Sequence, residues 1–238
     1  MRDGARRLAF RLTGGTHFGH RAYHPVLVEA LGPGRDRGRF RSDISDHLGF
    51  IFYFAVDAAP RLIVELGTRG GESTRALLAA ARTCDATMLS VDIDDCGGIE
   101  VPFRDRWNFV RADDVAFGRE GFVRWCDERS IAPRIDVLFI DTSHEYEHTR
   151  QELEAWTPHL APRGVMLFHD TNMGRGVYAR LDGSTGVGWN NNRDVIRAIE
   201  GFVSRRYDEQ SFFSDLTDQF AILHLPNCNG LTIMRRRS

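Results

Sequence analysis

The sequence contains no lysine, and all 31 of its basic residues are arginine. Lysine is normally a common surface residue and no rule of folding requires its absence, so we interpret the bias as the mark of a GC-rich genome. The absence excludes every mechanism that needs a lysine side chain. Schiff-base catalysis and phosphate capture by the lysine of a P-loop are the two main examples.

Cysteine and long hydrophobic runs are scarce as well. The four cysteines lie far apart and form no Cys-x-x-Cys pair, which argues against a zinc knuckle or a disulfide framework and is typical of reduced thiols. The N-terminal residues MRDGARRLAFRLTGG contain no continuous apolar stretch, and the strongest early run, Leu48 to Val56, is too short to span a bilayer. We therefore predict a cytoplasmic protein with no membrane partner.

Neither sign of charge is in excess, since 31 basic residues face 33 acidic ones and the formal net charge is -2. This balance predicts no broad basic surface for nucleic acid. Hydrophobic residues make up 42% of the 238 positions, which is enough for a sizeable core. The length suits one large domain with a small appendage. We predict a main domain over residues 45–238 and an N-terminal segment over residues 1–44.

The N-terminal segment is rich in glycine, arginine and histidine, and we interpret it as a helical cap. Its histidines His17, His20 and His24 lack a strict metal-binding spacing. A mobile lid or an oligomer contact is therefore favoured over a metal site there. We predict a homo-oligomer formed through this segment.

From Arg61 onward, short β-rich runs alternate with helical patterns, which is typical of an α/β fold with a doubly wound, mostly parallel sheet. Near the C-terminus two more runs flank Asn229-Gly230, a pair that favours a tight turn and so predicts an antiparallel hairpin. The predicted parallel strands are RLIVEL, TMLSVDI, WNFVRA, IDVLFI and GVMLFH; the hairpin strands are FAILHLP and LTIMRR; predicted helices include DHLGFIFYFAVDAA, STRALLAAARTC and EYEHTRQELEAWTPHL.

Ligands of parallel α/β sheets bind at the loops that leave the carboxyl ends of the strands. The first such loop, in ELGTRGGEST, has Gly67 and Gly71 for a tight turn, and Ser73 lies where a helix begins and free N–H groups favour an anion. Asp92 ends the second strand, about as far beyond the glycines as a carboxylate that binds a ribose diol. The pattern predicts a nucleoside-containing cofactor.

Two other interpretations of this loop stay open. The glycines and the aspartate can be ordinary turn chemistry with no ligand. A nicotinamide cofactor is the sharper alternative, but GTRGGE lacks the GxGxxG spacing. Glu65, near the end of the first strand, would also repel a pyrophosphate and better suits a cationic ligand.

Five segments, VELGTRGGEST, SVDIDD, VRADD, VLFIDTSHEY and VMLFHDT, resemble class I S-adenosylmethionine-dependent methyltransferases in their order and spacing. The likeness is greatest to metal-dependent O-methyltransferases that modify sugars and antibiotics, and it runs from about Arg61 through the terminal hairpin. It implies a Rossmann-like sheet of seven mostly parallel strands, with the hairpin supplying the antiparallel seventh strand.

The resemblance also implies how the cofactor is held. Glu65, Gly67 and Gly71 would line the methionine and ribose portion, Asp92 would bind the ribose hydroxyls, and Asp113 would lie beside the adenine. Arg69 departs from the family pattern, which commonly has a second glycine at that position.

The fourth and fifth predicted strands end in IDTSHEYEH and FHDTN, so carboxylates and imidazoles should converge at one edge of the sheet. Asp141 and Asp170 offer oxygen ligands for Mg²⁺ or Mn²⁺, and His169 can complete the shell with a nitrogen. Neighbouring strand residues point to opposite faces, so His169 and Asp170 can meet only if the chain leaves the strand there. Asp141 can alternatively touch the amino group of the cofactor or anchor the turn.

An alcohol is a poor nucleophile, and a divalent ion together with a base would supply alkoxide character for methyl transfer. In the resembling enzymes the Asp of an Asp-x-x-His stretch binds metal and the His is the base, which implies these roles for Asp141 and His144. Thr142 and Glu145 form a possible capping box that would orient His144.

The glycine-rich stretch from Thr171 to Arg193 is predicted to be a substrate loop, in which Trp189 can stack on a ring of the acceptor and the run Asn190 to Asn192 can bind its polar groups. The predicted function is metal-dependent methylation of a hydroxyl on a small molecule, a sugar or another natural-product intermediate, with S-adenosylmethionine as donor. The alternatives are an NAD-dependent oxidoreductase and a non-catalytic cofactor-binding protein.

Overall fold

The computed structural model describes residues 24–32, 42–174 and 176–237. Its centre is an eight-stranded sheet with the order β3-β2-β1-β4-β5-β10-β9-β8. Strands β1 to β5 pair in parallel, which confirms the doubly wound prediction. Their bounds are β1 (Leu62–Leu66), β2 (Thr87–Asp92), β3 (Trp107–Arg111), β4 (Ile135–Ile140) and β5 (Leu160–His169).

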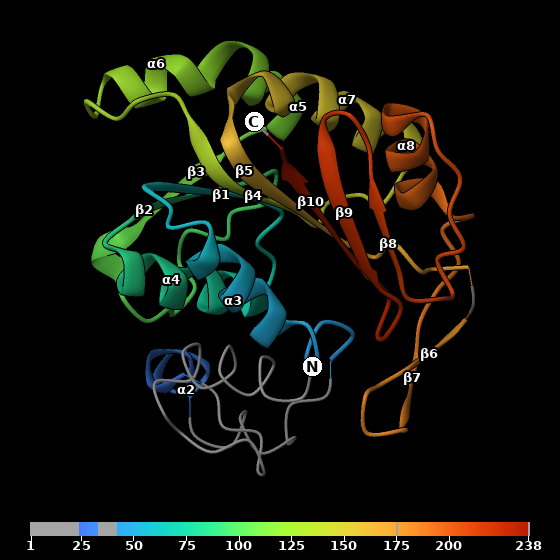
Figure 1. The fold of residues 1–238 in the computed structure, drawn as a ribbon. Helices are drawn as coiled ribbons and strands as arrows, with labels where there is room; N and C mark the ends of the chain where they lie inside the picture. The colour runs from blue at the N-terminus through green and yellow to red at the C-terminus, as the bar shows by residue number, and fades with distance from the viewer. Residues whose placement is uncertain (1–23, 33–41, 175, 238) are drawn as a thin grey trace, which may run out of the picture.

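Helices cover both faces of the sheet (Figure 1). One face carries α2 (Pro25–Leu31), α3 (Leu48–Asp57) and α4 (Glu72–Cys84); the other carries α5 (Asp114–Ala116), α6 (Phe122–Asp127), α7 (Tyr146–Trp156) and α8 (Asp194–Val203). Side chains alternate between the two faces of the sheet and pack into two separate hydrophobic cores. Val64, for example, packs into the core under α6–α8, and Ile63 packs into the core under α2–α4. The order of strands reverses between β1 and β4, which is where a ligand site is expected.

The C-terminal strands are β8 (Phe213–Leu216), β9 (Phe220–Leu225) and β10 (Leu231–Arg236), and β10 runs antiparallel to both β5 and β9. This confirms the predicted hairpin but corrects two details. The sheet has eight strands rather than seven. The sequence did not predict β8, because this strand is short and contains polar residues. The turn spans residues 226–230, and Cys228 and Gly230 have the left-handed φ values of 51° and 86°.

The predicted substrate loop holds two short strands of its own, β6 (Val177–Ala179) and β7 (Thr185–Val187). This small hairpin reaches the segment that precedes α3, where the N–H of Leu181 donates to the carboxylate of Asp46 at 2.6 Å. The hairpin therefore closes one side of the region where the strands end.

The N-terminal predictions lie partly outside the described residues, including those on His17 and His20. His24 lies within them, where its Nδ1 accepts the N–H of Val26 at the start of α2 and its ring packs on Phe52. The oligomer contact stays a prediction. Within the described parts of the chain, every helix is too short or too polar to cross a bilayer.

Candidate active site

The loop between β1 and α4 makes the tight turn that its glycines predict, with φ values of 84° at Gly67 and 76° at Gly71. A Cβ atom at Gly67 would lie 2.0 Å from the carbonyl oxygen of Asp141, so the end of β4 packs directly against this loop. Gly71 is the N-cap of α4, which begins at Glu72. Only glycine fits at position 67.

Glu65 lies behind this loop, fully buried, on the face of β1 that α4 covers. The hydroxyls of Ser73, Thr74 and Ser90 donate to its carboxylate at 2.7, 2.8 and 2.6 Å. These bonds tie the first turn of α4 to β1 and β2. Glu65 contributes to neither of the cavities described below. Ser73 lines the first of them, although its hydroxyl donates to Glu65, and the cofactor contacts of both residues remain predictions.

The pKa of Glu65 predicts how stability changes with pH. Burial raises that pKa from 4.5 to about 7, although the three hydroxyls oppose the rise. Because the folded state holds this proton more tightly than the unfolded state, stability should fall on the order of 3 kcal/mol as the pH rises from about 4.5 to about 7. Denaturant titrations across this range should show the fall in the wild type and a much smaller one in Glu65→Gln. Exposed Glu120→Gln is the control, and an unchanged slope in Glu65→Gln would refute the assignment.

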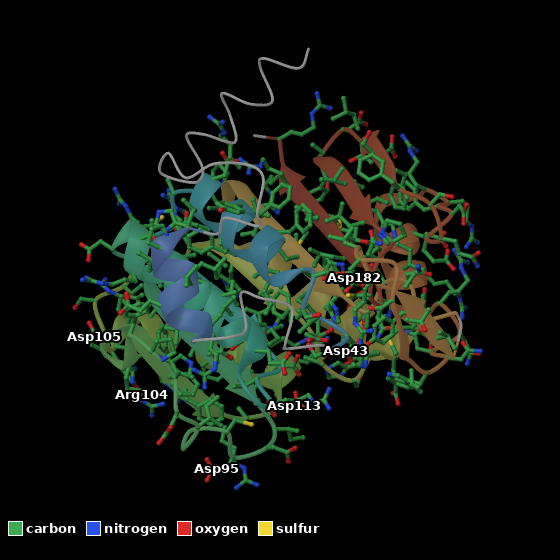
Figure 2. All side chains as sticks on the ribbon, turned by 90° about the horizontal axis from the view of Figure 1, so that it is seen from below. Asp43, Asp95, Arg104, Asp105, Asp113 and Asp182 are labelled. Carbon is green, nitrogen blue, oxygen red and sulfur yellow. The ribbon has the colours of Figure 1, made fainter. Side chains whose placement is uncertain are left out.

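Two cavities meet at the carboxyl ends of β1, β2 and β4, and both are lined by Gly67, Arg69 and Asp141. The first, about 280 Å³, lies between residues 67–73 and residues 42–44. The second, about 300 Å³, lies between the ends of β2, β3 and β4. Figure 2 labels one wall residue of each, Asp43 and Asp113, on the same side of the molecule. Together they form an elongated site across the switch point of the sheet.

Asp92 and Asp113 both line the second cavity, and their contacts with a nucleoside remain predictions. Oδ2 of Asp92 accepts the N–H groups of Thr68 and Arg69 at 2.7 and 3.2 Å, so this carboxylate also holds the glycine loop in place. Asp113 is the N-cap of α5, where its Oδ1 accepts the N–H of Ala116. The cavity wall is therefore acidic and locally rigid.

Asp141, His144, His169 and Asp170 come together at the ends of β4 and β5, and we call them the His–Asp cluster. His144 Nε2 lies 3.1 Å from Asp141 Oδ1 and 2.9 Å from Asp170 Oδ2. His169 Nδ1 lies 3.4 Å from Asp141 Oδ1 and 3.2 Å from Asp170 Oδ1. The four side chains predicted from the two strand ends thus lie in mutual contact.

Backbone conformation explains how two consecutive residues reach the same cluster. β5 ends at His169, and Asp170 adopts the left-handed φ of 56°, so the chain leaves the strand where the sequence required it to. His144 is also left-handed, with a φ of 61°. The predicted capping box is wrong, because α7 begins only at Tyr146 and the Thr142 hydroxyl donates to Glu152 instead. The carboxylates, not a cap, hold His144.

The electrostatics of the His–Asp cluster favour protonated histidines beside ionised aspartates. Burial lowers the pKa of His144, but the hydrogen bonds that its Nε2 donates to Asp141 and Asp170, together with the negative charge of these carboxylates, outweigh burial and raise that pKa to about 9. Burial likewise opposes ionisation of Asp170, yet the charges of His169 and His144 hold its pKa far below the usual range. Burial also opposes ionisation of Asp141, but the charge of His169 and hydrogen bonds from both histidines lower its pKa, so the two carboxylates are ionised at neutral pH.

The donor set fits a divalent ion. One ligand atom each from Asp141, His144 and Asp170 lies within 4.8 Å of the others. Oδ1 of Asp170 is buried and receives no well-aligned hydrogen bond, although His169 lies near. Without an ion the two protonated histidines compensate the carboxylates of Asp141 and Asp170, and a divalent ion held by the same oxygens would take over that role.

The sequence analysis missed one neighbour of the cluster. His47, directly before α3, is 1% exposed, and its ring packs edge-on against that of His169 with centroids 5.4 Å apart. His47 belongs to an apolar helical run, far in sequence from the strand ends. The site residues were predicted from the loops that follow the strands, so the sequence offered no reason to include His47. Trp189, which was predicted to face the acceptor, lies 5.4 Å from the ring of His144.

Two comparisons of the sequence with known proteins found matches that include the residues of this site or part of the chain. Residues 64–171 match the family model described as a methyltransferase domain. The uncharacterized protein y4gI of Sinorhizobium fredii is 33% identical over 123 residues, a match that spans 48% of this chain and only 13% of that protein.

Solved methyltransferases share the fold. The O-methyltransferase from Bacillus cereus in complex with SAH (S-adenosylhomocysteine) has a TM-score of 0.57 at 12% identity, covering 98% of this chain and 97% of that one. The SAH-bound Podospora anserina methyltransferase PaMTH1 has a TM-score of 0.54 at 15% identity, covering 99% and 96%. MycE, solved with Mg, SAH and Mycinamycin VI, has 0.54 at 17% identity, covering 89% and 54%.

The chain therefore has the fold of these solved methyltransferases, as the sequence motifs predicted. The stretch that matches the methyltransferase-domain model, residues 64–171, includes the glycine loop, the three residues that both cavities share and the whole His–Asp cluster.

Proposed function

We propose that the protein transfers a methyl group from S-adenosylmethionine to a hydroxyl of a small molecule, assisted by a divalent ion, Mg²⁺ or Mn²⁺. The observation that carries this proposal is the position of the His–Asp cluster, which shares Asp141 with both cavities of the methyltransferase domain. A cofactor that filled the cavities would present its methyl group beside the cluster.

The carboxylates of Asp141 and Asp170 would hold the ion, with His169, whose Nδ1 lies 3.4 and 3.2 Å from them, as a further donor. The ion would supply the positive charge that lowers the pKa of an acceptor hydroxyl. His144, whose side chain is 12% exposed, would take the hydroxyl proton, whereas His169 is 2% exposed and would support the carboxylates. If Asp141 and Asp170 bound the ion, His144 would lose its hydrogen bonds to these carboxylates, which keep it protonated. It would then become available as a base.

The β6–β7 hairpin and Trp189 would form the acceptor side of the site. Trp189 is 50% exposed beside His144, and the hairpin exposes Val177 and Val187 by 56% and 90%. An exposed apolar surface next to polar catalytic groups suits a ring that carries a hydroxyl, as in a sugar attached to an apolar natural product. MycE, a methyltransferase from the mycinamycin biosynthetic pathway that was solved with Mg, SAH and Mycinamycin VI, has a similar fold.

Trp189→Ala should raise KM for a hydroxyl acceptor roughly three- to tenfold, which corresponds to a ring contact of about 0.5–1.5 kcal/mol. SAH affinity should stay unchanged, because Trp189 is absent from the walls of the two cavities. Steady-state kinetics and calorimetry measure the two quantities. Phe212→Ala, at an aromatic residue that is 62% exposed just before β8, is the matched control. Equal KM in both variants would remove Trp189 from acceptor binding.

The proposal as a whole is tested by binding and transfer. Calorimetry should show micromolar or tighter binding of SAH, and labelled methyl groups should pass to hydroxyl compounds with Mg²⁺ or Mn²⁺ but not with chelator. No heat with SAH would refute the methyl donor. Binding without transfer across a broad acceptor panel would favour a non-catalytic cofactor-binding protein, and changes in nicotinamide absorbance with alcohols would favour an oxidoreductase.

A further inference from the structure

A second group of possible metal ligands lies outside the His–Asp cluster and shares no residue with it. It consists of Asp114, His148 and Glu152, which we call the Asp114 cluster. Asp114 is the first residue of α5, after β3, while His148 and Glu152 stand one turn apart on α7. One ligand atom from each residue lies within 4.8 Å of the other two.

The separations between these atoms resemble those within a coordination shell. His148 Nε2 lies 3.1 Å from Asp114 Oδ1 and 3.6 Å from Glu152 Oε1. Two ligands that are each about 2.1 Å from an octahedral ion lie about 3 Å apart. The hydroxyl of Thr142 donates to Glu152 Oε1 at 2.7 Å and fixes the orientation of that carboxylate. Small movements would therefore suffice to place three ligands around one ion.

Burial makes this cluster short of positive charge. Glu152 is 0% exposed and Asp114 is 7% exposed. Oδ2 of Asp114 and Oε2 of Glu152 are buried, and the described residues send no N–H or O–H donor to either atom. If both carboxylates are ionised beside a neutral imidazole, their negative charge is uncompensated, which is costly. A single dication would balance both carboxylates with His148 neutral.

We propose that Asp114, His148 and Glu152 bind a divalent ion of the Mn²⁺ type, separate from the ion at Asp141 and Asp170. Two carboxylates favour Mn²⁺ or Mg²⁺, and the imidazole shifts the preference toward Mn²⁺. Asp114 and His148 also line the second cavity, which leaves room for water ligands on that side. The ion would fasten α7 to the loop after β3, and so fix the wall of the cavity.

A shared proton is the competing arrangement. Burial and the neighbouring charge of Asp114 raise the pKa of Glu152 well above its ordinary value, so a protonated Glu152 can donate to Asp114. Such a pair would hold the same side chains together without any metal. Counting bound ions separates the two arrangements.

The test is a Mn²⁺ titration of the metal-free, full-length protein, followed by electron paramagnetic resonance of the free ion. The wild type should bind two equivalents. Glu152→Gln, which keeps its size and its partner Thr142, should bind one, and Asp141→Asn should bind the other one. Mn²⁺ should raise the Tm of Asp141→Asn, and that rise should vanish in the double variant.

His148→Gln changes a half-buried residue, so it gives a second variant that does not depend on the buried Glu152. Wild-type stoichiometry in both Glu152→Gln and His148→Gln would overturn the proposal and favour the shared proton. One equivalent in the wild type that disappears in Asp141→Asn would overturn it as well. One equivalent that disappears in Glu152→Gln but persists in Asp141→Asn would support this site and count against the metal of the proposed function.

Discussion

Asp170→Asn is expected to lower kcat for methyl transfer by about a thousandfold or more, while the Kd for SAH stays within a fewfold of the wild type. Asp170 is 3% exposed, contacts both histidines of the His–Asp cluster and lies outside the walls of the two cavities. The amide keeps the shape of the side chain but removes the negative charge that the proposed metal and the proposed base would require. A general base alone contributes about 10²–10⁴-fold, so loss of base and ion together is a large effect.

The measurement pairs single-turnover transfer of labelled methyl groups with SAH calorimetry and a thermal melt that confirms folding. Asp127→Asn, at the exposed end of α6, is the control for an isosteric loss of charge elsewhere. If Asp170→Asn retained full turnover, and the wild type did so in chelator, the ion would have no part in the reaction. A large loss of SAH affinity would instead show that Asp170 helps to hold the cofactor.

The loops at the strand ends were predictable because each has a local signal. Gly67 and Gly71 mark a turn that only glycine can make, and Asp141 and Asp170 follow apolar runs long enough to be buried strands. In a parallel sheet such ends meet at one edge, so the chain order alone brings the His–Asp cluster together.

Other features depend on contacts between distant parts of the chain and could not be read locally. The sequence places Glu65 at a strand end, but only the packing of α4 shows that hydroxyls from Ser73 and Ser90 surround it. His47 reaches the cluster through the docking of α3 onto the sheet. His148 and Glu152 do have a local signal, the spacing of one helical turn, but their partner Asp114 comes from a different loop.

Gly67→Ala should disrupt the site by forcing the backbone of the glycine loop or of Asp141 to move. Its φ of 84° costs an alanine about 1–2 kcal/mol, and the new Cβ would lie 2.0 Å from the carbonyl oxygen of Asp141. Backbone must move to relieve that contact, which adds about 1–3 kcal/mol as in overpacked cores. We expect a Tm lower by roughly 6–15 °C and SAH affinity reduced at least tenfold, because the loop and the end of β4 form both cavities.

Gly70→Ala is the matched control in the same loop. A Cβ there meets no atom within 4 Å, and its φ lies outside the left-handed region, so the change should alter stability by no more than about 0.5 kcal/mol. Thermal melts and SAH calorimetry on both variants separate a specific contact from general sensitivity of the loop. If both variants lost affinity equally, flexibility of the whole loop would matter for binding. If neither did, the close approach of Gly67 to Asp141 would have no role in holding the cofactor, since the two cavities would tolerate its loss.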